Sequence, residues 1–339
     1  MAILYVTEQG ASIRHIAGRI IVRRENRIIQ EWPDFKVEQI VAFGNVQVTP
    51  QTMDYCFQQG IDVSFLSSTG RYRGRLQANL TKNAALRQRQ YERRTDAEFC
   101  RTNAAAIVIG KIRNMAVMVR RQRRLRDDGR SPIADLEGLI PKVAAAANHD
   151  SLYGFEGTAS AAYFGAFRAA LRGDWKFEAR QYHPPPDEVN ALLSFGYTLL
   201  HNDLFAAINI VGLDPFMGFF HQPRLGHAAL ASDLMEEHRC VVVDRLVLTM
   251  LNKRIISDKD FVATPHQGFR LVPEALKRFL GLYARQTAEV VSYPAKGIQT
   301  SYRKVMEQQV RQFARVLIGE EPVYKPYLFT DEPLQNDGR

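Results

Sequence analysis

The sequence has few cysteines and no long apolar run, and both shortages exclude classes of protein. No stretch of about 18 apolar residues occurs, so we expect no transmembrane helix. The opening residues, MAILYVTEQG, place no basic region before an apolar segment, which predicts a strand rather than a secretory signal. The three cysteines, Cys56, Cys100 and Cys240, lie too far apart to form a disulfide framework or a zinc site. This usage favours the reducing cytoplasm.

Several catalytic signatures are missing as well. The zinc-protease motif HExxH, the nucleophile elbow GxSxG and the phosphate-binding loop GxxxxGK[ST] do not occur. His221 and His227 are six residues apart and would not share a helix face. No repeat of fixed period is visible. None of these local signatures therefore assigns a chemistry to the chain.

Arginine, by contrast, is abundant and unevenly distributed. The chain has 45 Lys and Arg residues against 36 Asp and Glu, a formal net charge of +9. One basic segment contains Arg120, Arg121, Arg123, Arg124 and Arg126 after Lys111 and Arg113, and another contains Arg87, Arg89, Arg93 and Arg94. Such density favours a polyanion, because neutralised phosphates release counterions and because Arg grips phosphate bidentately. A solvated helical surface is the alternative interpretation.

The first part of the chain predicts short strands separated by turns. With 339 residues, of which 46% are apolar, the chain is long enough for two domains with sizeable cores. Residues rich in Ile and Val predict strands at Ala2–Val6, Ser12–His15, Arg19–Val22, Ile28–Trp32, Val37–Phe43, Val46–Val48, Ile61–Leu66 and Arg71–Leu76. Thr49 and Pro50 are typical of a helix start, and Gly60 is typical of a helix end.

Beyond residue 79 the pattern changes to helical spacing. Apolar residues recur every three or four positions, as at Ala105, Ile109, Ile112, Ala116 and Val119. We predict an α+β fold with a β-rich domain over residues 1–76, followed by a larger all-α domain over 91–329. Residues 77–90 would form a linker and the start of the first long helix. The polar residues 330–339 would form a disordered tail.

The segment LASDLMEEHR concentrates negative charge. Asp233 lies three and four residues before Glu236 and Glu237, so all three would face the same side of a helix. Like charges in this arrangement repel, and a divalent cation would relieve the repulsion. A solvated acidic face is the alternative.

Two further segments carry isolated polar groups among apolar neighbours. Glu156 lies in LYGFEGTASAAYF, where small residues predict close packing of another element against this helix. His221 follows two phenylalanines in GLDPFMGFFHQPR. An exposed Glu near a helix start and a core His are the alternatives. One His with several carboxylates suits Mg²⁺ or Mn²⁺ better than zinc, and such a metal on a basic protein indicates phosphodiester chemistry.

These blocks, taken in order, resemble the CRISPR-associated integrase of the spacer-adaptation module. The resemblance rests on the Glu156, His221 and Asp233 blocks, and it extends through LYVTEQG, IVAFGNVQVTPQTMDYC, FLSSTGRYRG, PPPDEVNALLSFGYTLL and QQVRQFARVLIGEEPVYKPY. It implies that the catalytic and metal-binding residues are Glu156, His221, Asp233 and Glu236, with Glu237 as the alternative to Glu236.

The resemblance also implies an activity and partners. It implies a metal-dependent DNA endonuclease that inserts spacer DNA into a CRISPR repeat by attack of a 3′-hydroxyl on a phosphodiester. The expected partners are double-stranded DNA, a second copy bound through the β-rich domain, and a second small adaptation protein that bridges two dimers. Candidate DNA contacts are Arg120, Arg121, Arg123, Arg124, Tyr163 and Tyr197, although aromatics at such spacing are more often in the core. A nuclease without integration activity, a small phosphate-ester hydrolase and a non-catalytic DNA-binding scaffold remain alternatives.

Overall fold

The structure is a computed structural model that describes residues 2–68, 70–76, 83–122, 132–181, 184–264 and 268–330. The chain forms two compact units. The first comprises residues 1–80 and 270–284, and the second comprises residues 81–269 and 285–339. The sequence predicted a boundary near residue 76 but did not indicate that 270–284 belongs with the first unit. Within that unit Lys277 pairs with Glu8 at 2.8 Å. Three features lie outside the described residues: Arg123 and Arg124, the residues Asp127-Asp128-Gly129, which predict a break after the first long helix, and the predicted tail from 331 onward.

Two small sheets build the first unit. One has the strand order β1-β5-β7-β8, in which the first three strands run parallel and β8 pairs antiparallel with β7. The other has the order β4-β3-β2-β6, in which β6 runs parallel to β2. The elements are β1 (Ala2–Val6), β2 (Ala11–Ile16), β3 (Arg19–Arg24), β4 (Arg27–Pro33), β5 (Val37–Phe43), β6 (Val46–Val48), α1 (Pro50–Gln59), β7 (Asp62–Leu66) and β8 (Tyr72–Leu76). These strands confirm the predicted series.

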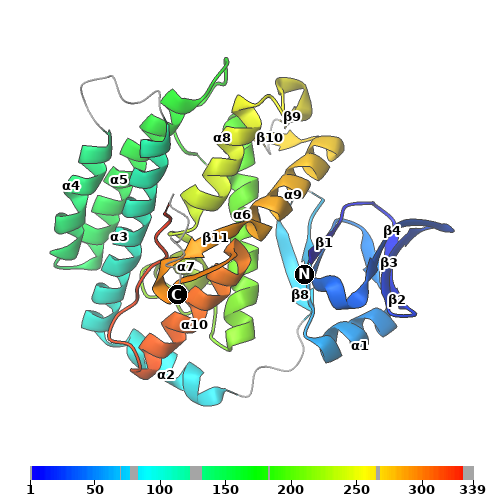
Figure 1. Cartoon of the computed structure of the whole chain (residues 1–339), viewed down its shortest axis with the longest axis horizontal. Coiled ribbons are helices and arrows are strands. Elements are labelled where there is room, and N and C mark those ends of the chain that lie inside the picture. The colour runs from blue at the N-terminus through cyan, green and yellow to red at the C-terminus, as the bar shows by residue number, and fades with distance from the viewer. Residues whose placement is uncertain are drawn as a thin grey trace, which may run out of the picture. The chain divides into compact units, whose positions relative to one another are not determined.

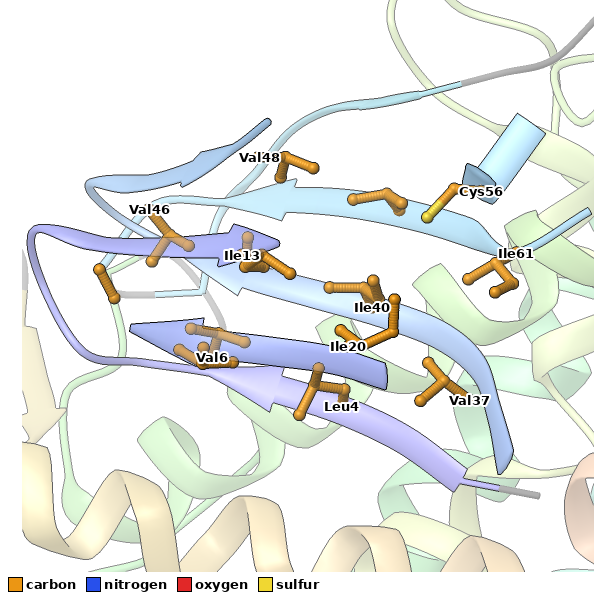
Figure 2. Close-up of a cluster of buried hydrophobic side chains, with 14 residues drawn as sticks. Leu4, Val6, Ile13, Ile20, Val37, Ile40, Val46, Val48, Cys56 and Ile61 are labelled. Carbon is orange, nitrogen blue, oxygen red and sulfur yellow. The ribbon is translucent and has the colours of Figure 1, made fainter. Parts of the chain in front are cut away.

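Alternating side chains from both sheets form the core of this unit (Figure 2). Leu4 and Val6 of β1 lie in the same buried cluster as Ile13 of β2 and Ile20 of β3. Successive side chains of a strand point to opposite faces, so every second residue enters the core. Helix α1 begins with Pro50 in its first turn and ends at Gly60, whose φ of 68° suits glycine.

Helices dominate the second unit. They are α2 (Ala84–Arg94), α3 (Ala97–Arg121), α4 (Pro132–Ala144), α5 (His149–Ala170), α6 (Glu188–Val211), α7 (Ala229–Met235), α8 (Arg245–Asn252) and α10 (Tyr302–Ile318), and α9 (Pro273–Ala288) has only its last residues here. Helices α3, α4 and α5 pack side by side, and α6 packs against α7 and α10 (Figure 1). A π-helical segment (Arg239–Asp244) joins α7 to α8. None of the helices in the described ranges combines the length and apolarity needed to cross a membrane.

Short strands interrupt the predominantly helical part, which the sequence predicted to be all-α. They are β9 (Phe261–Thr264), β10 (Gly268–Leu271), β11 (Val290–Tyr293) and β12 (Ile298–Ser301). Strands β11 and β12 pair antiparallel, from Val290 opposite Ser301 to Tyr293 opposite Ile298. Gly297, with a φ of 63°, ends the connection between them. Pro294 and Gly297 predict a loop at 293–297, but four-residue strands are too short to show an alternating pattern.

Candidate active site

The structure brings the four predicted site residues of the second unit into one connected group. Glu156 lies on α5, His221 lies in the connection from α6 to α7, Asp233 lies on α7, and Glu236 immediately follows α7. His221 contacts both Asp233 and Glu236. Glu156 and Glu236 are joined through Lys111 of α3, a residue that sequence reasoning did not place in the site.

Helix α5 positions Glu156 at the edge of a tightly packed face. The side chain of Asn148 caps the helix by accepting a hydrogen bond from the Ser151 N–H at 2.9 Å. Ala159, less than one turn after Glu156, is fully buried, as expected for small residues against which α3 and α4 pack. The hydroxyl of Ser160 donates to Glu156 Oε1 at 2.8 Å. Glu156 itself remains 22% exposed, so its carboxylate is accessible to a ligand.

Asp233 organises the chain that leads to His221. Its carboxylate accepts the backbone N–H groups of Phe219 at 2.6 Å, Phe220 at 3.0 Å and His221 at 2.7 Å. The side chain is completely buried. A Cβ at Gly218 would lie 2.7 Å from the Ala229 carbonyl carbon and 2.9 Å from Asp233 Oδ2, so only glycine fits there. The motif GLDPFMGFFH is therefore a loop fastened to α7 by one buried carboxylate.

The same carboxylate orients the imidazole of His221. Nδ1 of His221 lies 2.8 Å from Asp233 Oδ1, and Nε2 lies 3.9 Å from Glu236 Oε1. An ionised carboxylate only accepts hydrogen bonds, so Nδ1 carries the proton and Nε2 points toward Glu236. Burial lowers the pKa of His221, but the hydrogen bond and charge of Asp233 outweigh it and raise the pKa overall. This carboxylate–histidine pair is a common support for a metal-binding imidazole.

Glu236 is a fully charged carboxylate at neutral pH. Burial disfavours its charge, but Arg239, Lys111 and His221 outweigh burial and lower its pKa to about 2. Arg239 Nη2 lies 3.1 Å from Oε1, and Lys111 Nζ lies 2.6 Å from Oε2. The two cations hold the carboxylate from both sides.

Lys111 is buried rather than part of the basic surface that the sequence predicted. Only 3% of it is exposed, and its ammonium contacts both Glu156 and Glu236. Burial lowers the pKa of Lys111, but the two carboxylates outweigh that effect and raise it. The helical spacing could have predicted that Lys111 is buried, because Val108 and Met115 lie three and four residues away on the same face of α3 and are also buried.

Glu237 points away from this group and fastens a segment of residues 322–330, which we call the strap. Glu237 accepts hydrogen bonds from the Tyr324 hydroxyl at 2.8 Å and from the Tyr327 N–H at 3.0 Å. Asn114 of α3 donates to the Tyr327 carbonyl and accepts from the Phe329 N–H, both at 2.8 Å. A Cβ at Gly110 would overlap Pro326. The structure therefore assigns Glu237 to holding the strap against α3, one turn from Lys111.

The two tyrosines predicted to contact DNA lie in the core, which corrects that prediction. Tyr163 is 2% exposed and packs against Phe164 and Phe167. Tyr197 is 8% exposed, and its hydroxyl donates to Asp244 Oδ1 at 2.5 Å. A buried ring offers no face on which a base can stack. Both tyrosines lie at positions where the apolar spacing of their helices predicts a buried side chain, and this alternative to DNA contact is the correct one.

The predicted arginines fall into three groups. Arg120 is exposed at the end of α3 and pairs with Glu137 at 2.6 Å. Arg121 is exposed and lies over the ring of Phe329, 4.7 Å from its centroid. Arg123 and Arg124 lie outside the described residues. In the second basic segment, Arg94 donates to Gln222 next to His221 at 2.7 Å, so it supports the site loop.

The donor set fits a hard divalent cation. Across the parts of the chain that are described, no three His, Cys, Asp or Glu side chains already form a metal cage. The Lys111 ammonium lies between Glu156 and Glu236. Two carboxylates that share an ammonium and one imidazole nitrogen 3.9 Å from one of them are donors of a type that suits Mg²⁺ or Mn²⁺.

Comparison with solved structures defines the class of protein. A casposase bound to an integration product has the same fold, with a TM-score of 0.83, 21% identity, and coverage of 100% of this chain and 96% of that one. A CAS1 protein from Thermotoga maritima matches with a TM-score of 0.81 and 25% identity over 98% of this chain and all of that one. The two-part architecture is therefore that of Cas1-type proteins.

The sequence comparisons identify the family. The family described as CRISPR associated protein Cas1 matches residues 4–285. A CRISPR-associated endonuclease Cas1 of Thermus thermophilus is 34% identical over 330 residues, covering 96% of this chain and 97% of its own length. One from Chlorobaculum tepidum is 32% identical over 337 residues, with 96% and 98% coverage. The chain belongs to the Cas1 family, which confirms the resemblance noted in the sequence.

Proposed function

We propose that this chain is a metal-dependent DNA endonuclease and integrase that inserts short spacer DNA into a CRISPR repeat. The observation that carries this proposal is that Glu156 and Glu236 share one buried ammonium, Lys111, and that Nε2 of His221 lies 3.9 Å from Glu236 Oε1, within a Cas1-family chain. Curated relatives that match nearly the whole chain are named endonucleases. A structural relative named a casposase was solved with an integration product.

The roles that we propose for the site residues differ from those implied by the sequence, which counted Asp233 among the metal ligands. We assign Glu156, Glu236 and Nε2 of His221 as the groups that would hold Mg²⁺ or Mn²⁺. Asp233 already accepts three backbone N–H groups and Nδ1 of His221, so we assign it as the residue that orients His221. Bound in this place, the metal would polarise a phosphodiester oxygen and neutralise charge that develops during the reaction.

The proposed reaction is a transesterification. The 3′-hydroxyl oxygen of the spacer forms a bond to the repeat phosphorus, the bond from that phosphorus to the repeat 3′ oxygen breaks, and the hydroxyl proton is transferred to the departing oxygen through solvent. One phosphodiester replaces another, so no covalent protein intermediate is required. Asp233 fixes the imidazole, and Arg239 fixes Glu236, so the polar groups are in place before DNA binds.

Partners are proposed from the relatives. A solved Cas6-RT-Cas1–Cas2 complex matches this chain with a TM-score of 0.80 and 26% identity, over 98% of this chain and 36% of that one. We propose a second small adaptation protein as a partner, a homodimer through the β-rich first unit, and double-stranded DNA as substrate. Arg120 and Arg121 are exposed at the end of α3 and remain candidates for contact with the DNA backbone.

A strand-transfer assay tests the proposal. A supercoiled plasmid that carries the repeat is incubated with a short duplex, the purified chain and Mn²⁺, with or without EDTA. We expect joined product only with metal, and none from Glu156→Gln. The matched control is Glu178→Gln, which neutralises an exposed glutamate of the same unit and should integrate normally.

The outcomes separate the alternatives. Cutting without joining would favour the nuclease without integration activity. DNA binding with neither cutting nor joining, in the wild type and in Glu156→Gln alike, would favour the scaffold. Integration by Glu156→Gln at the wild-type rate would refute the assignment of the site.

A further inference from the structure

Lys111 occupies a place where a lysine is costly. It lies on the inner face of α3, where Val108 is fully buried and Met115 is 3% exposed. An ammonium group removed from water must be paired to be tolerated. Lysine also carries a long flexible stem, so its charge can move several ångströms without any change in the backbone.

The partners of Lys111 are the two carboxylates assigned to the metal. Its Nζ contacts Glu156 and lies 2.6 Å from Glu236 Oε2. Each carboxylate has a second support, Ser160 for Glu156 at 2.8 Å and Arg239 for Glu236 at 3.1 Å. One ammonium therefore bridges a carboxylate from α5 and a carboxylate from the end of α7. Their second contacts keep both carboxylates in position on either side of the ammonium.

The charges of this group nearly balance. With a neutral His221, the three carboxylates Glu156, Asp233 and Glu236 face the two cations Lys111 and Arg239. Adding a divalent cation with Lys111 in place would change an excess of one negative charge into an excess of one positive charge in a largely buried space. The ammonium also occupies the carboxylate oxygens that the metal needs. The metal can bind tightly only if Lys111 moves away or if an anion arrives.

We propose that Lys111 is a built-in counter-cation, which holds Glu156 and Glu236 together before the metal binds and then transfers to a phosphate of bound DNA. This inference rests on the proposed metal-dependent function. It makes metal and DNA binding cooperative, because DNA supplies the anion that receives the displaced ammonium. By linkage, metal strengthens DNA binding by the same factor as DNA strengthens metal binding.

Mn²⁺ titration of the full chain, followed by electron paramagnetic resonance, tests the proposal. Titrations are run alone and with a duplex whose 3′ ends lack hydroxyls, so that no reaction occurs. For the wild type we expect weak Mn²⁺ binding that tightens when the duplex is present. Lys111→Met keeps the length of the side chain but removes its charge. We expect it to bind Mn²⁺ about tenfold more tightly without DNA, since a nearby like charge is removed, and to gain less from the duplex.

Two further variants control for net charge and for folding. Lys142→Met removes the same charge from an exposed position on α4 and should bind Mn²⁺ as the wild type does. Lys111→Gln offers a polar neutral side chain in case methionine distorts the packing. Thermal melting without metal should show Lys111→Met below the wild type, because two carboxylates lose their bridge, and Mn²⁺ should raise the melting temperature of this variant by more.

The results distinguish failure of this inference from failure of the proposed function. If the wild type binds Mn²⁺ and loses it in Glu156→Gln, while both Lys111 variants bind Mn²⁺ with unchanged or weaker affinity, the counter-cation role is refuted and the metal site stands. An unchanged gain from the duplex in the Lys111 variants would refute transfer of the ammonium to DNA. If the wild type binds no Mn²⁺ in either condition, both proposals are refuted.

Discussion

Asp233 Oδ1 lies 2.8 Å from His221 Nδ1 and 2.7 Å from the backbone nitrogen of the same residue. One carboxylate oxygen therefore fixes both the position of His221 in the loop and the rotation of its ring. The nitrogen left to face Glu236 is Nε2. The orientation of the His221 ring is thus fixed by Asp233, a residue that is itself completely buried.

Asp233→Asn should damage both the fold and the site. An amide presents one oxygen and two N–H groups where the structure places only donors, so some of the N–H groups of residues 219–221 lose their acceptor. A buried unsatisfied group costs about 1–3 kcal/mol, and we expect a loss of about 3 kcal/mol in the free energy of unfolding. Urea unfolding measures this loss, and Mn²⁺ affinity should fall as well. Wild-type stability in this variant would show that the loop is held by other contacts.

Glu237→Gln should affect stability without affecting the metal. Its carboxylate accepts from Tyr324, Tyr327 and Gln309, and an amide cannot serve all three donors. We expect a loss of about 2 kcal/mol in the free energy of unfolding and unchanged Mn²⁺ affinity of the folded protein. Glu156→Gln should show the reverse pattern. Loss of Mn²⁺ binding in folded Glu237→Gln would contradict this prediction and would indicate that Glu237 is a metal ligand.

Asp244 should make stability depend on pH in the acid range. Burial raises its pKa to about 6, against the opposing hydrogen bond from Tyr197. The folded protein thus holds this proton more tightly than the unfolded chain does, so the contribution of Asp244 is fully present below the unfolded pKa of 3.8 and is lost as pH rises through about 6.

The comparison of wild type with Asp244→Asn isolates this effect. The stability of the wild type relative to the variant should fall by about 1.4 kcal/mol per pH unit at the steepest point between the two pKa values and level off above the folded one. Chemical unfolding at a series of pH values measures the difference. Parallel stability curves for the two proteins would show that Asp244 does not titrate in this range.

Gly218→Ala should disturb the loop that carries His221. The added Cβ would meet the Ala229 backbone at 2.7 Å, so the loop must shift away from α7. We expect a loss of about 2 kcal/mol, typical of overpacking, and weaker Mn²⁺ binding. Gly165→Ala on α5 is the matched control, because nothing lies within 4 Å of its added Cβ. It should be neutral or stabilising by up to about 1 kcal/mol. Equal melting temperatures for the two variants would contradict the proposed close approach.

Local sequence patterns were sufficient to predict the strands and the helix of residues 2–76. Strand positions from β1 to β8 followed from alternation and turn residues, and the α1 boundaries followed from Pro50 and Gly60. Contacts between distant segments could not be obtained in this way. Residues 270–284 complete the first unit, although no local pattern links them to residues 1–80.

The site was predicted as a set of residues but not as an arrangement. Helical spacing grouped Asp233, Glu236 and Glu237, yet the chain after α7 separates them, so that Asp233 faces the loop, Glu236 faces Lys111, and Glu237 faces the strap. Lys111 was missed because lysine within an arginine-rich stretch is typical of a surface. Burial of Lys111 can be explained only when its partners Glu156 and Glu236, which come from distant parts of the chain, are known.

The strap also has a consequence for synthesis of the protein. Residues 322–330 are made after the residues of the active site, yet they pack against Asn114 and Gly110 on either side of Lys111. A nascent chain can therefore expose Glu156, His221 and Glu236 before the helix that carries Lys111 is fully supported. The contacts that support α3 on either side of Lys111 are thus completed only after residues 322–330 have been translated.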